Sequence, residues 1–531
     1  MAELLHELLF NIAAHSPEQT AIVHDRHGTL SYGDLATCVK HFADAVTGLG
    51  LERRDRVATY LPKRPETVTA MLGATTAGGV FVPVNPLLKA RQVAHILQDC
   101  NVRVLVTTPE RLAFLNNDLH TCHDLHTVVL VEDGDATGAE LNPPFRTLPW
   151  QAFLNAPPAS VTHCCIDTDM AAILYTSGST GSPKGVVLSH RNVVTGAKSV
   201  ANYLDITASD RLLAVLPFSF DYGLNQLTTA CLKGATTVLM DYLLPRDVIR
   251  SVADHRITGL AAVPPLWVQL ARLPWPEDAV ENLRYITNSG GAMPRAVTQS
   301  LREALPKTRV FLMYGLTEAF RSTYLPPEEL DRRPESIGKA IPSAEILVVR
   351  EDGSLCAPGE PGELVHRGSL VAMGYWNDPE RTAQRYKPVP GQPSGLPMPE
   401  MAVWSGDTVK TDEDGFLYFI GRRDEMIKTS GYRVSPTEVE EVLYATGEVA
   451  EAAAIGIYHP VLGQGVVAVV KPAGEAFSAD ALIIACKRDL PNFMVPLRVL
   501  TMESLPRNPN GKIDRRKLVE EYDELFREED A

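Results

Sequence analysis

The sequence predicts an α/β protein with a large amino-terminal domain of layered sheets, a small β-rich subdomain and a small α+β carboxy-terminal domain. Strand-like and helix-like segments alternate from about residue 20 to residue 350, which is typical of layered α/β structure with mostly parallel sheets. Near residues 345–420 the pattern changes to short strands and turns. Beyond Gly421 the pattern changes again, to a compact mixture of helices and strands.

Individual elements follow from local patterns. Apolar runs predict strands at residues 103–107, 127–131, 212–216 and 236–240, with helical stretches between them. Short runs at 344–350, 362–367 and 415–420 predict the strands of the β-rich subdomain. Five prolines within 388–399 predict an exposed loop.

Composition narrows the class of protein. A hydrophobic content of 45% and a charged content of 22% are typical of a soluble globular protein. The formal net charge of −15 argues against nucleic acid and anionic membranes as partners. Two uncharged windows, 67–88 and 452–470, are broken by glycine and proline, so we expect no membrane insertion. Eight cysteines without a Cys-x-x-Cys pair, and no evident secretory signal, predict a reduced, cytoplasmic protein without structural zinc.

The most informative segment is a loop between two apolar strands, at 171–174 and 186–188. It is rich in serine, threonine and glycine and contains one lysine, a composition that suits a polyphosphate. Glycines let backbone N–H groups approach phosphate oxygens, hydroxyls donate hydrogen bonds to them and the lysine supplies positive charge. The order of residues is not that of a Walker A loop. A flexible linker is the alternative, but linkers seldom join two buried strands. The expected phosphate contacts are Thr176, Ser177, Gly178, Ser179, Thr180, Gly181 and Lys184.

Together with further motifs, this loop resembles that of the AMP-forming adenylating enzymes. The matching motifs are Tyr-Gly-Leu-Thr-Glu ending at Glu318, Ser-Gly-Asp-Thr around Asp407, and Pro-Asn-Gly-Lys ending at Lys512. The superfamily includes acyl-CoA synthetases, adenylation domains of peptide synthetases and firefly luciferase, and the resemblance covers nearly the whole chain. The motif set is most similar to acyl-CoA ligases found with exosortase systems and to stand-alone ligases that load amino acids onto carrier proteins.

The resemblance implies a reaction and a domain organisation. A carboxylic acid would be activated with ATP and Mg²⁺ as acyl-AMP, and then transferred to the phosphopantetheine thiol of CoA or of a carrier protein. Residues 1–423 would form the large domain, with the β-rich subdomain at about 340–423, and residues 424–531 the small domain, with the hinge at Asp424. A monomer or homodimer is expected.

The resemblance also assigns the nucleotide site. Glu318 would reach Mg²⁺, which takes oxygen ligands, and Tyr314 would offer a face to adenine. Asp407 would accept both ribose hydroxyls, and Arg422 would make a second ribose or phosphate contact. Taken singly, each of these residues could be an ordinary surface or turn residue. The remaining expected nucleotide contacts are Gly290, Gly291, Ala292, Met313, Gly315, Leu316, Thr317 and Phe419.

Three small-domain residues are expected to serve the two half-reactions, one in adenylate formation and two after the small domain rotates. Lys512 matches the lysine that lies between the substrate carboxylate and the α-phosphate, where a fixed cation offsets the repulsion between two anions. The alternative is that Asn510-Gly511 forms a hairpin turn and Lys512 points to water. Gly431 matches the glycine that leaves room for a pantetheine arm after the small domain rotates, and Lys428 would then face the active site. The expected catalytic residues are Lys512, Glu318, Thr180 and Lys428.

The expected acid pocket is polar. Its residues are Phe220, Asp221, Tyr222, Asn225, Ser289 and Arg321. Phe-Asp at 220–221 resembles amino-acid adenylation domains, in which the aspartate holds the substrate ammonium. Asp221 could instead pair internally with Arg321, since a buried carboxylate needs a cation.

The favoured substrate is therefore an amino acid or another polar acid. An ordinary synthetase for a fatty or aryl acid is the alternative, although a long fatty acid would leave polar groups desolvated. A catalytically silent nucleotide-binding scaffold is a further hypothesis. It is disfavoured because Lys512, Glu318 and Asp407 are all present.

Overall fold

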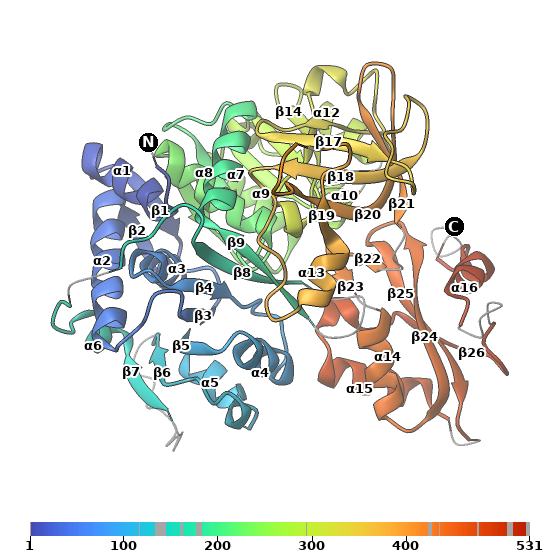
Figure 1. Ribbon diagram of the computed structural model, residues 1–531, viewed down its shortest axis with the longest axis horizontal. Helices are drawn as coiled ribbons and strands as arrows, with labels where there is room; N and C mark the ends of the chain where they lie inside the picture. Colours follow the sequence, from blue (N-terminus) through green and yellow to red (C-terminus); the bar gives the residue numbers. More distant parts are fainter. Residues whose placement is uncertain are drawn as a thin grey trace.

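The computed structural model describes residues 2–115, 117–132, 145–159, 163–176, 183–291, 293, 295–393, 395–422, 427–434, 436–474, 477–506 and 513–526 (Figure 1). Within these residues the strands form three sheets. Two of them build the large amino-terminal part, and the third belongs to the carboxy-terminal part, which is orange to red in Figure 1.

The first sheet has seven strands in the order β7-β6-β5-β3-β4-β8-β9. All neighbours are parallel except β8 and β9, which form an antiparallel hairpin. The strands are β3 (Arg56–Tyr60), β4 (Val80–Pro83), β5 (Val102–Thr107), β6 (Thr127–Leu130), β7 (Arg146–Pro149), β8 (Met170–Thr176) and β9 (Lys184–Ser189).

The second sheet has fourteen strands and changes character along its length. Strands β11, β10, β12, β13 and β14 are parallel neighbours, and from β14 onward the pairing becomes antiparallel. The strands are β1 (Thr20–His24), β2 (Gly28–Ser31), β10 (Arg211–Ala214), β11 (Thr236–Leu239), β12 (Gly259–Ala262), β13 (Tyr285–Asn288), β14 (Arg309–Tyr314), β15 (Thr323–Leu325), β16 (Ser336–Ala340), β17 (Ala344–Val349), β18 (Gly362–Gly368), β19 (Tyr386–Pro388), β20 (Met401–Thr411) and β21 (Leu417–Arg422).

The third sheet contains β22 (Ile427–Thr429), β23 (Tyr432–Val434), β24 (Val449–His459), β25 (Gly463–Pro472) and β26 (Arg498–Thr501). Helices α14 (Pro436–Ala445), α15 (Ala479–Asp489) and α16 (Arg515–Tyr522) accompany it. Its apolar core is built from side chains of these elements, such as Val439, Ala468 and Leu482.

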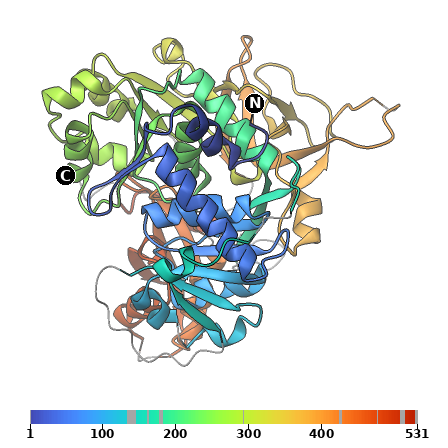
Figure 2. The same cartoon turned by 90° about the vertical axis from the view of Figure 1, so that its left-hand side faces the viewer.

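The other helices belong to the large part, where α2 and α3 pack together (Figure 2). Phe42 on α2 packs against Trp150 and Phe153, with ring centroids 5.8 and 5.2 Å away. These helices are α1 (Glu7–His15), α2 (Tyr32–Gly48), α3 (Pro65–Thr76), α4 (Ala90–Asp99), α5 (Pro109–Leu115), α6 (Trp150–Leu154), α7 (His190–Tyr203), α8 (Asp221–Lys233), α9 (Pro245–Asp254), α10 (Pro264–Leu270), α11 (Glu277–Asn282), α12 (Arg295–Ala304) and α13 (Pro379–Arg385). Short 3₁₀ helices lie at η1 (Leu119–Thr121), η2 (Thr317–Ala319), η3 (Pro327–Glu329) and η4 (Asn492–Met494).

The predicted fold class is confirmed, as are the strands expected from local patterns. The two uncharged segments are ordinary elements of the fold. Residues 67–88 form most of α3 and all of β4, and residues 452–470 form most of the β24–β25 hairpin. Within the described part of the chain, no helix combines the length and the apolar character that crossing a membrane requires. The proline-rich segment follows β19 as a loop, in which the Met398 side chain is 80% exposed.

Candidate active site

The expected site residues gather at the carboxyl ends of parallel strands in both large sheets. The phosphate loop follows β8, Ser289 and Gly290 follow β13, and the segment from Gly315 to Glu318 follows β14. Ligands of open α/β sheets bind at this edge, where strand ends and their loops meet. The fold therefore brings together motifs that are far apart in the sequence.

The phosphate loop joins the two strands of the β8–β9 hairpin, where Thr176 stands opposite Lys184. Gly185 is required by packing, because a Cβ atom there would lie 2.7 Å from Ile173 Cγ2. The expected phosphate contacts within the loop lie outside the described residues: Ser177, Gly178, Ser179, Thr180 and Gly181. Thr176 and Lys184, at the two ends of the loop, are described.

Lys184 and Glu318 form an ion pair at the loop end of this hairpin. Lys184 Nζ lies 3.2 Å from Glu318 Oε1, and the Tyr375 hydroxyl donates a 2.6 Å hydrogen bond to the same oxygen. Arg385 Nε lies 4.0 Å from it. Glu318 is 1% exposed, so these groups compensate a carboxylate that is removed from water.

Tyr375 and Arg385 were missed by sequence reasoning, because no motif marks either residue. Burial, followed by the negative charge of Glu318, raises the pKa of the Tyr375 hydroxyl. Tyr375 therefore keeps its proton and remains a hydrogen-bond donor to Glu318.

The donor set around Glu318 fits a magnesium–nucleotide complex. Among the described residues, no cluster of three or more His, Cys, Asp or Glu side chains is present that could hold a metal alone. Mg²⁺ is commonly bound through one or two carboxylates, with phosphate oxygens and water completing its coordination. Glu318 can supply such a carboxylate, and the buried Thr176 Oγ1 has no hydrogen-bond partner among the described residues.

Asp407 and Tyr314 meet where the nucleoside is expected. The Tyr314 hydroxyl donates a 2.5 Å hydrogen bond to Asp407 Oδ2, and both residues are buried. Phe419 on β21 lies beside Tyr314, with ring centroids 6.4 Å apart, and Lys428 Nζ lies 4.5 Å from the Phe419 centroid. Arg422 stands opposite Asp407 in the β20–β21 register.

The remaining expected nucleotide residues lie on the loops after β13 and β14. Gly290 has a φ of +84°, and the Asn288 side chain donates a 3.0 Å hydrogen bond to the Gly291 carbonyl. Ala292 lies outside the described residues. On the β14 side, Met313, Leu316 and Thr317 are buried next to Gly315.

The nucleotide motif touches the expected acid pocket directly. The Thr317 hydroxyl donates a 3.2 Å hydrogen bond to Asp221 Oδ1, and Arg321 Nη1 donates a 2.6 Å hydrogen bond to Asp221 Oδ2. Both members of this ion pair are at most 3% exposed. Of the two roles that the sequence leaves open for Asp221, the structure shows the internal pair with Arg321.

Other acid-pocket residues surround this pair. Tyr222 and Asn225 lie on α8 with Asp221, and Ser289 is buried at the end of β13. The Tyr222 hydroxyl is 2.5 Å from Thr287 Oγ1, and the Arg321 guanidinium lies 4.7 Å from the Tyr222 ring centroid. Phe220 is the N-cap residue of α8 and packs edge to face on Tyr222.

A turn at Phe320 directs Arg321 toward α8. Phe320 has a φ of +57°, which a residue with a bulky side chain seldom adopts, and its side chain is fully buried. The Arg321 Nη1 group also donates a 3.0 Å hydrogen bond to the Phe320 carbonyl. Strained backbone of this kind persists when surrounding contacts enforce it, and it is common at functional sites.

The Gly431 loop of the carboxy-terminal part lies against the large part. Gly431 has a φ of +80°, and a Cβ atom there would lie 2.7 Å from Val263 Cγ1. The Gly431 carbonyl oxygen also lies beside Gly290, 3.7 Å from where a Cβ atom would stand. Both the backbone conformation and the close approach therefore require glycine.

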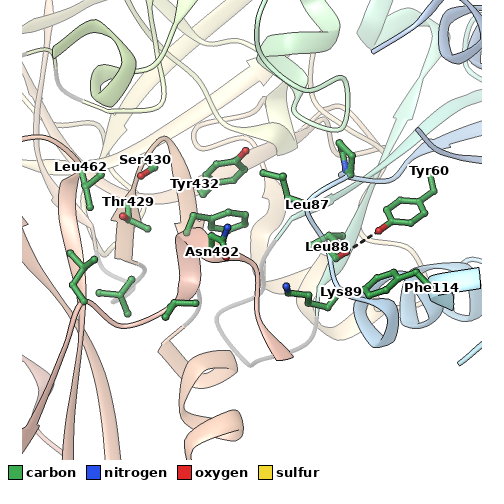
Figure 3. Close-up of a pocket in the computed structure, with 15 residues that line it drawn as sticks. Tyr60, Leu87, Leu88, Lys89, Phe114, Thr429, Ser430, Tyr432, Leu462 and Asn492 are labelled. Carbon is green, nitrogen blue, oxygen red and sulfur yellow. Dashed lines mark hydrogen bonds between the residues drawn. The ribbon is translucent and has the colours of Figure 1, made fainter. Parts of the chain in front are cut away.

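A pocket of about 600 Å³ lies beside this loop, between the two parts of the chain (Figure 3). Its lining residues from the large part include Tyr60, Leu87, Leu88, Lys89 and Phe114, and those from the carboxy-terminal part include Thr429, Ser430, Tyr432, Leu462 and Asn492. The Tyr60 hydroxyl donates a 3.0 Å hydrogen bond to the Leu88 carbonyl on one wall. Lys512 and Asp424 lie outside the described residues.

We expect Asp407→Asn to raise the KM for ATP by roughly 10- to 100-fold, because hydrogen bonds to a charged partner contribute about 1.5–3 kcal/mol. Adenylate formation at varied ATP concentration measures this change. Asp352→Asn, in an exposed turn of the same β-rich region, is the matched control. An unchanged KM for ATP in the Asp407 variant would contradict the ribose assignment.

The residues expected to bind a nucleotide lie at strand ends of a large α/β part, and a small α+β part lies against it, an arrangement that suits an AMP-forming enzyme. Family models agree: residues 9–376 match the AMP-binding enzyme model, and residues 438–512 match its C-terminal domain. The chain belongs to the AMP-binding enzyme family, and it is an AMP-forming acid–thiol ligase.

Relatives that match nearly all of this chain differ in what they act on. The chain is 30% identical to the L-proline–[L-prolyl-carrier protein] ligase of Pseudomonas fluorescens, over 98% of this chain and all of that protein. It is 29% identical to a long-chain-fatty-acid–CoA ligase of Mycobacterium tuberculosis, over 93% of each chain. It is also 32% identical to tyrocidine synthase 2 of Brevibacillus parabrevis, but spans only 14% of that longer protein.

Solved structures share the whole fold. An o-succinylbenzoate CoA synthetase from Bacillus subtilis, bound with a product analogue, has a TM-score of 0.82 at 27% identity, covering 97% of this chain and 98% of its own. ATP-bound MatB from Rhodopseudomonas palustris has a TM-score of 0.70 at 25% identity, covering 99% of this chain and all of its own.

Proposed function

We propose that this ligase activates a small polar carboxylic acid as its acyl-adenylate and transfers the acyl group to a phosphopantetheine thiol. The observation that carries the proposal is the buried Asp221–Arg321 pair beside Thr317 of the nucleotide motif. Arg321 Nε and Nη2 are buried and have no hydrogen-bond partner among the described residues, so a fatty acid lying against them would leave them unsatisfied, which is costly. A polar acid can satisfy them.

In the first half-reaction, Lys184 and the phosphate loop would bind the triphosphate, and Asp407 would bind the ribose. Glu318 would hold Mg²⁺, which supplies positive charge to the phosphate oxygens. Lys512 would lie between the acid carboxylate and the α-phosphate, where it offsets the repulsion between two anions. Pyrophosphate is the product released.

The second half-reaction would use the pose seen here. Gly431 lies against Val263, and Lys428 lies beside Phe419 of the expected nucleotide site. We propose that residues 1–423 and 424–531 are the two domains, with the hinge at Asp424. The pocket beside Tyr432 would admit the phosphopantetheine arm.

The acceptor is CoA or a carrier protein. The proline ligase relative acts on a carrier protein, and its similarity over the full chain favours that acceptor. The fatty-acid–CoA ligase relative supports the alternative of an ordinary acyl-CoA synthetase.

All eight cysteines are free, which agrees with the proposed reduced, cytoplasmic location. A monomer or homodimer remains our prediction.

Pyrophosphate release across a panel of aliphatic, aromatic, polar and amino acids tests the substrate class, and thioester formation with CoA or a phosphopantetheinylated carrier protein tests the acceptor. We expect polar acids to exceed fatty acids of equal length in kcat/KM. Preference for fatty or aryl acids would overturn the proposal. ATP binding without pyrophosphate release for any acid would support the silent scaffold instead.

A further inference from the structure

Two buried side chains of the acid pocket retain polar groups that no described residue satisfies. Arg321 Nε and Nη2, and both polar atoms of the Asn225 amide, have no hydrogen-bond partner within the described part of the protein. Arg321 is 2% exposed and Asn225 is 1% exposed. Folded proteins satisfy nearly all such groups, so two buried side chains with unsatisfied polar atoms need an explanation.

These two side chains belong to one site. Asn225 follows Asp221 by one helical turn on α8, which places both on the same face of the helix. Arg321 reaches this face through its ion pair with Asp221. A Cβ atom at Gly315 would lie 3.6 Å from Arg321 Nη1, so the guanidinium also lies against the nucleotide motif.

The orientation of the guanidinium determines what it can still bind. Its contact with the Tyr222 ring and the two hydrogen bonds made by Nη1 fix its plane and use one edge. The Nε and Nη2 groups form the other edge, and their parallel N–H bonds match two oxygens of a carboxylate or one strong carbonyl acceptor. Asn225 adds an amide that both donates and accepts.

We infer that Arg321 and Asn225 form a subsite for an oxygen acceptor on the acyl chain of the substrate, either a second carboxylate or a carbonyl. Donors dominate the subsite, because a guanidinium has no acceptor atom. An ammonium would find one unpaired acceptor, the Asn225 amide oxygen, beside the Arg321 cation, and Asp221 already accepts hydrogen bonds from Arg321 and Thr317. A methyl end would leave the groups unsatisfied. The inference rests on the proposed function, since it names the substrate class of the same acid site.

The test is a series of straight-chain acids of increasing length, each prepared with a methyl, carboxylate, carboxamide or ammonium end. Pyrophosphate release gives kcat/KM for every member. At the optimal length we expect the carboxylate- or carboxamide-ended acid to exceed its methyl-ended analogue by about 10²-fold or more, because sites built for hydrogen bonds strongly reject analogues that lack them. Comparing these two acceptor-ended acids separates an anionic from a neutral ligand.

Arg321→Lys and Asn225→Leu test the assigned side chains. The lysine keeps a cation for Asp221 but removes the second edge of the guanidinium, and the leucine removes the amide at similar volume. We expect each variant to lose about 10-fold or more of the preference for acceptor-ended over methyl-ended acids, while the KM for ATP stays close to that of the parent. Thermal unfolding identifies any variant that fails to fold. In that case the other variant alone tests whether the assigned side chains hold the acceptor.

Each outcome has a distinct meaning. Preference for ammonium-ended or α-amino acids, unchanged in both variants, overturns the inference and leaves the proposed polar-acid function standing. Preference for methyl-ended acids overturns both the inference and the proposed polar-acid function. An acceptor preference that survives in both folded variants shows that other residues hold the acceptor, and it also overturns the inference.

Discussion

Replacing Lys512 with alanine is expected to lower adenylate formation by roughly 10²- to 10³-fold while ATP still binds. This is the loss seen when one preorganised electrostatic group is removed from an active site. The lysine would lie between two anions in the first half-reaction only. Pyrophosphate release and ATP binding measure the two effects separately.

The same variant should form thioester from preformed acyl-AMP at nearly the parental rate. In the proposed second pose, Lys428 lies beside Phe419 of the expected nucleotide site and would take over the role of the facing cation. Lys517→Ala, on an exposed position of α16, is the matched control for a lost positive charge. An equal loss of rate in adenylate formation and in thioester formation would contradict the two-pose mechanism.

Gly431→Trp is expected to abolish most thioester formation, by about 10²-fold or more, while leaving adenylation nearly intact. A Cβ atom at Gly431 already overlaps Val263, so an indole cannot fit while the loop keeps its place. Overpacking at such a contact forces backbone movement. Pyrophosphate release and acyl transfer from preformed acyl-AMP to the thiol distinguish the two half-reactions.

Gly447→Trp is the matched control for backbone strain. Gly447 also lies in the carboxy-terminal part and has a φ of +74°, but no atom lies within 4 Å of a Cβ atom built there. It therefore introduces similar strain away from the domain contact. If Gly431→Trp slows pyrophosphate release as strongly as acyl transfer, the thiol-channel assignment is wrong.

Much of the fold could be predicted because it is encoded locally. Apolar runs of four to seven residues gave strands such as β5, β6, β11 and β17 close to their observed bounds. The change from parallel to antiparallel pairing comes after β14, which ends at Tyr314, and therefore earlier in the chain than the change that the sequence indicates near residue 345. The joining of β15 and β16 to the large sheet was not predicted, because strand pairing depends on distant neighbours.

The candidate site was predicted unevenly. Motif residues Lys184, Tyr314, Glu318 and Asp407 do converge, and their proposed ligand contacts remain predictions. Tyr375 and Arg385 were not found, because they reach Glu318 from a segment whose sequence has no distinctive pattern. The expected contacts Thr180, Lys512 and Asp424 lie outside the described residues, so the sequence alone supports them.

The sequence by itself determined the α/β class, the phosphate-binding composition of the loop and the residues of the nucleotide motifs. Each of these depends on neighbours in the chain, which a local pattern records. Only the tertiary structure decided that Asp221 pairs with Arg321, 100 residues away, and that buried polar groups of Arg321 and Asn225 have no hydrogen-bond partner among the described residues. Such pairing depends on how a strained turn at Phe320 and the face of α8 are packed together, and packing between distant segments leaves no local pattern in the sequence.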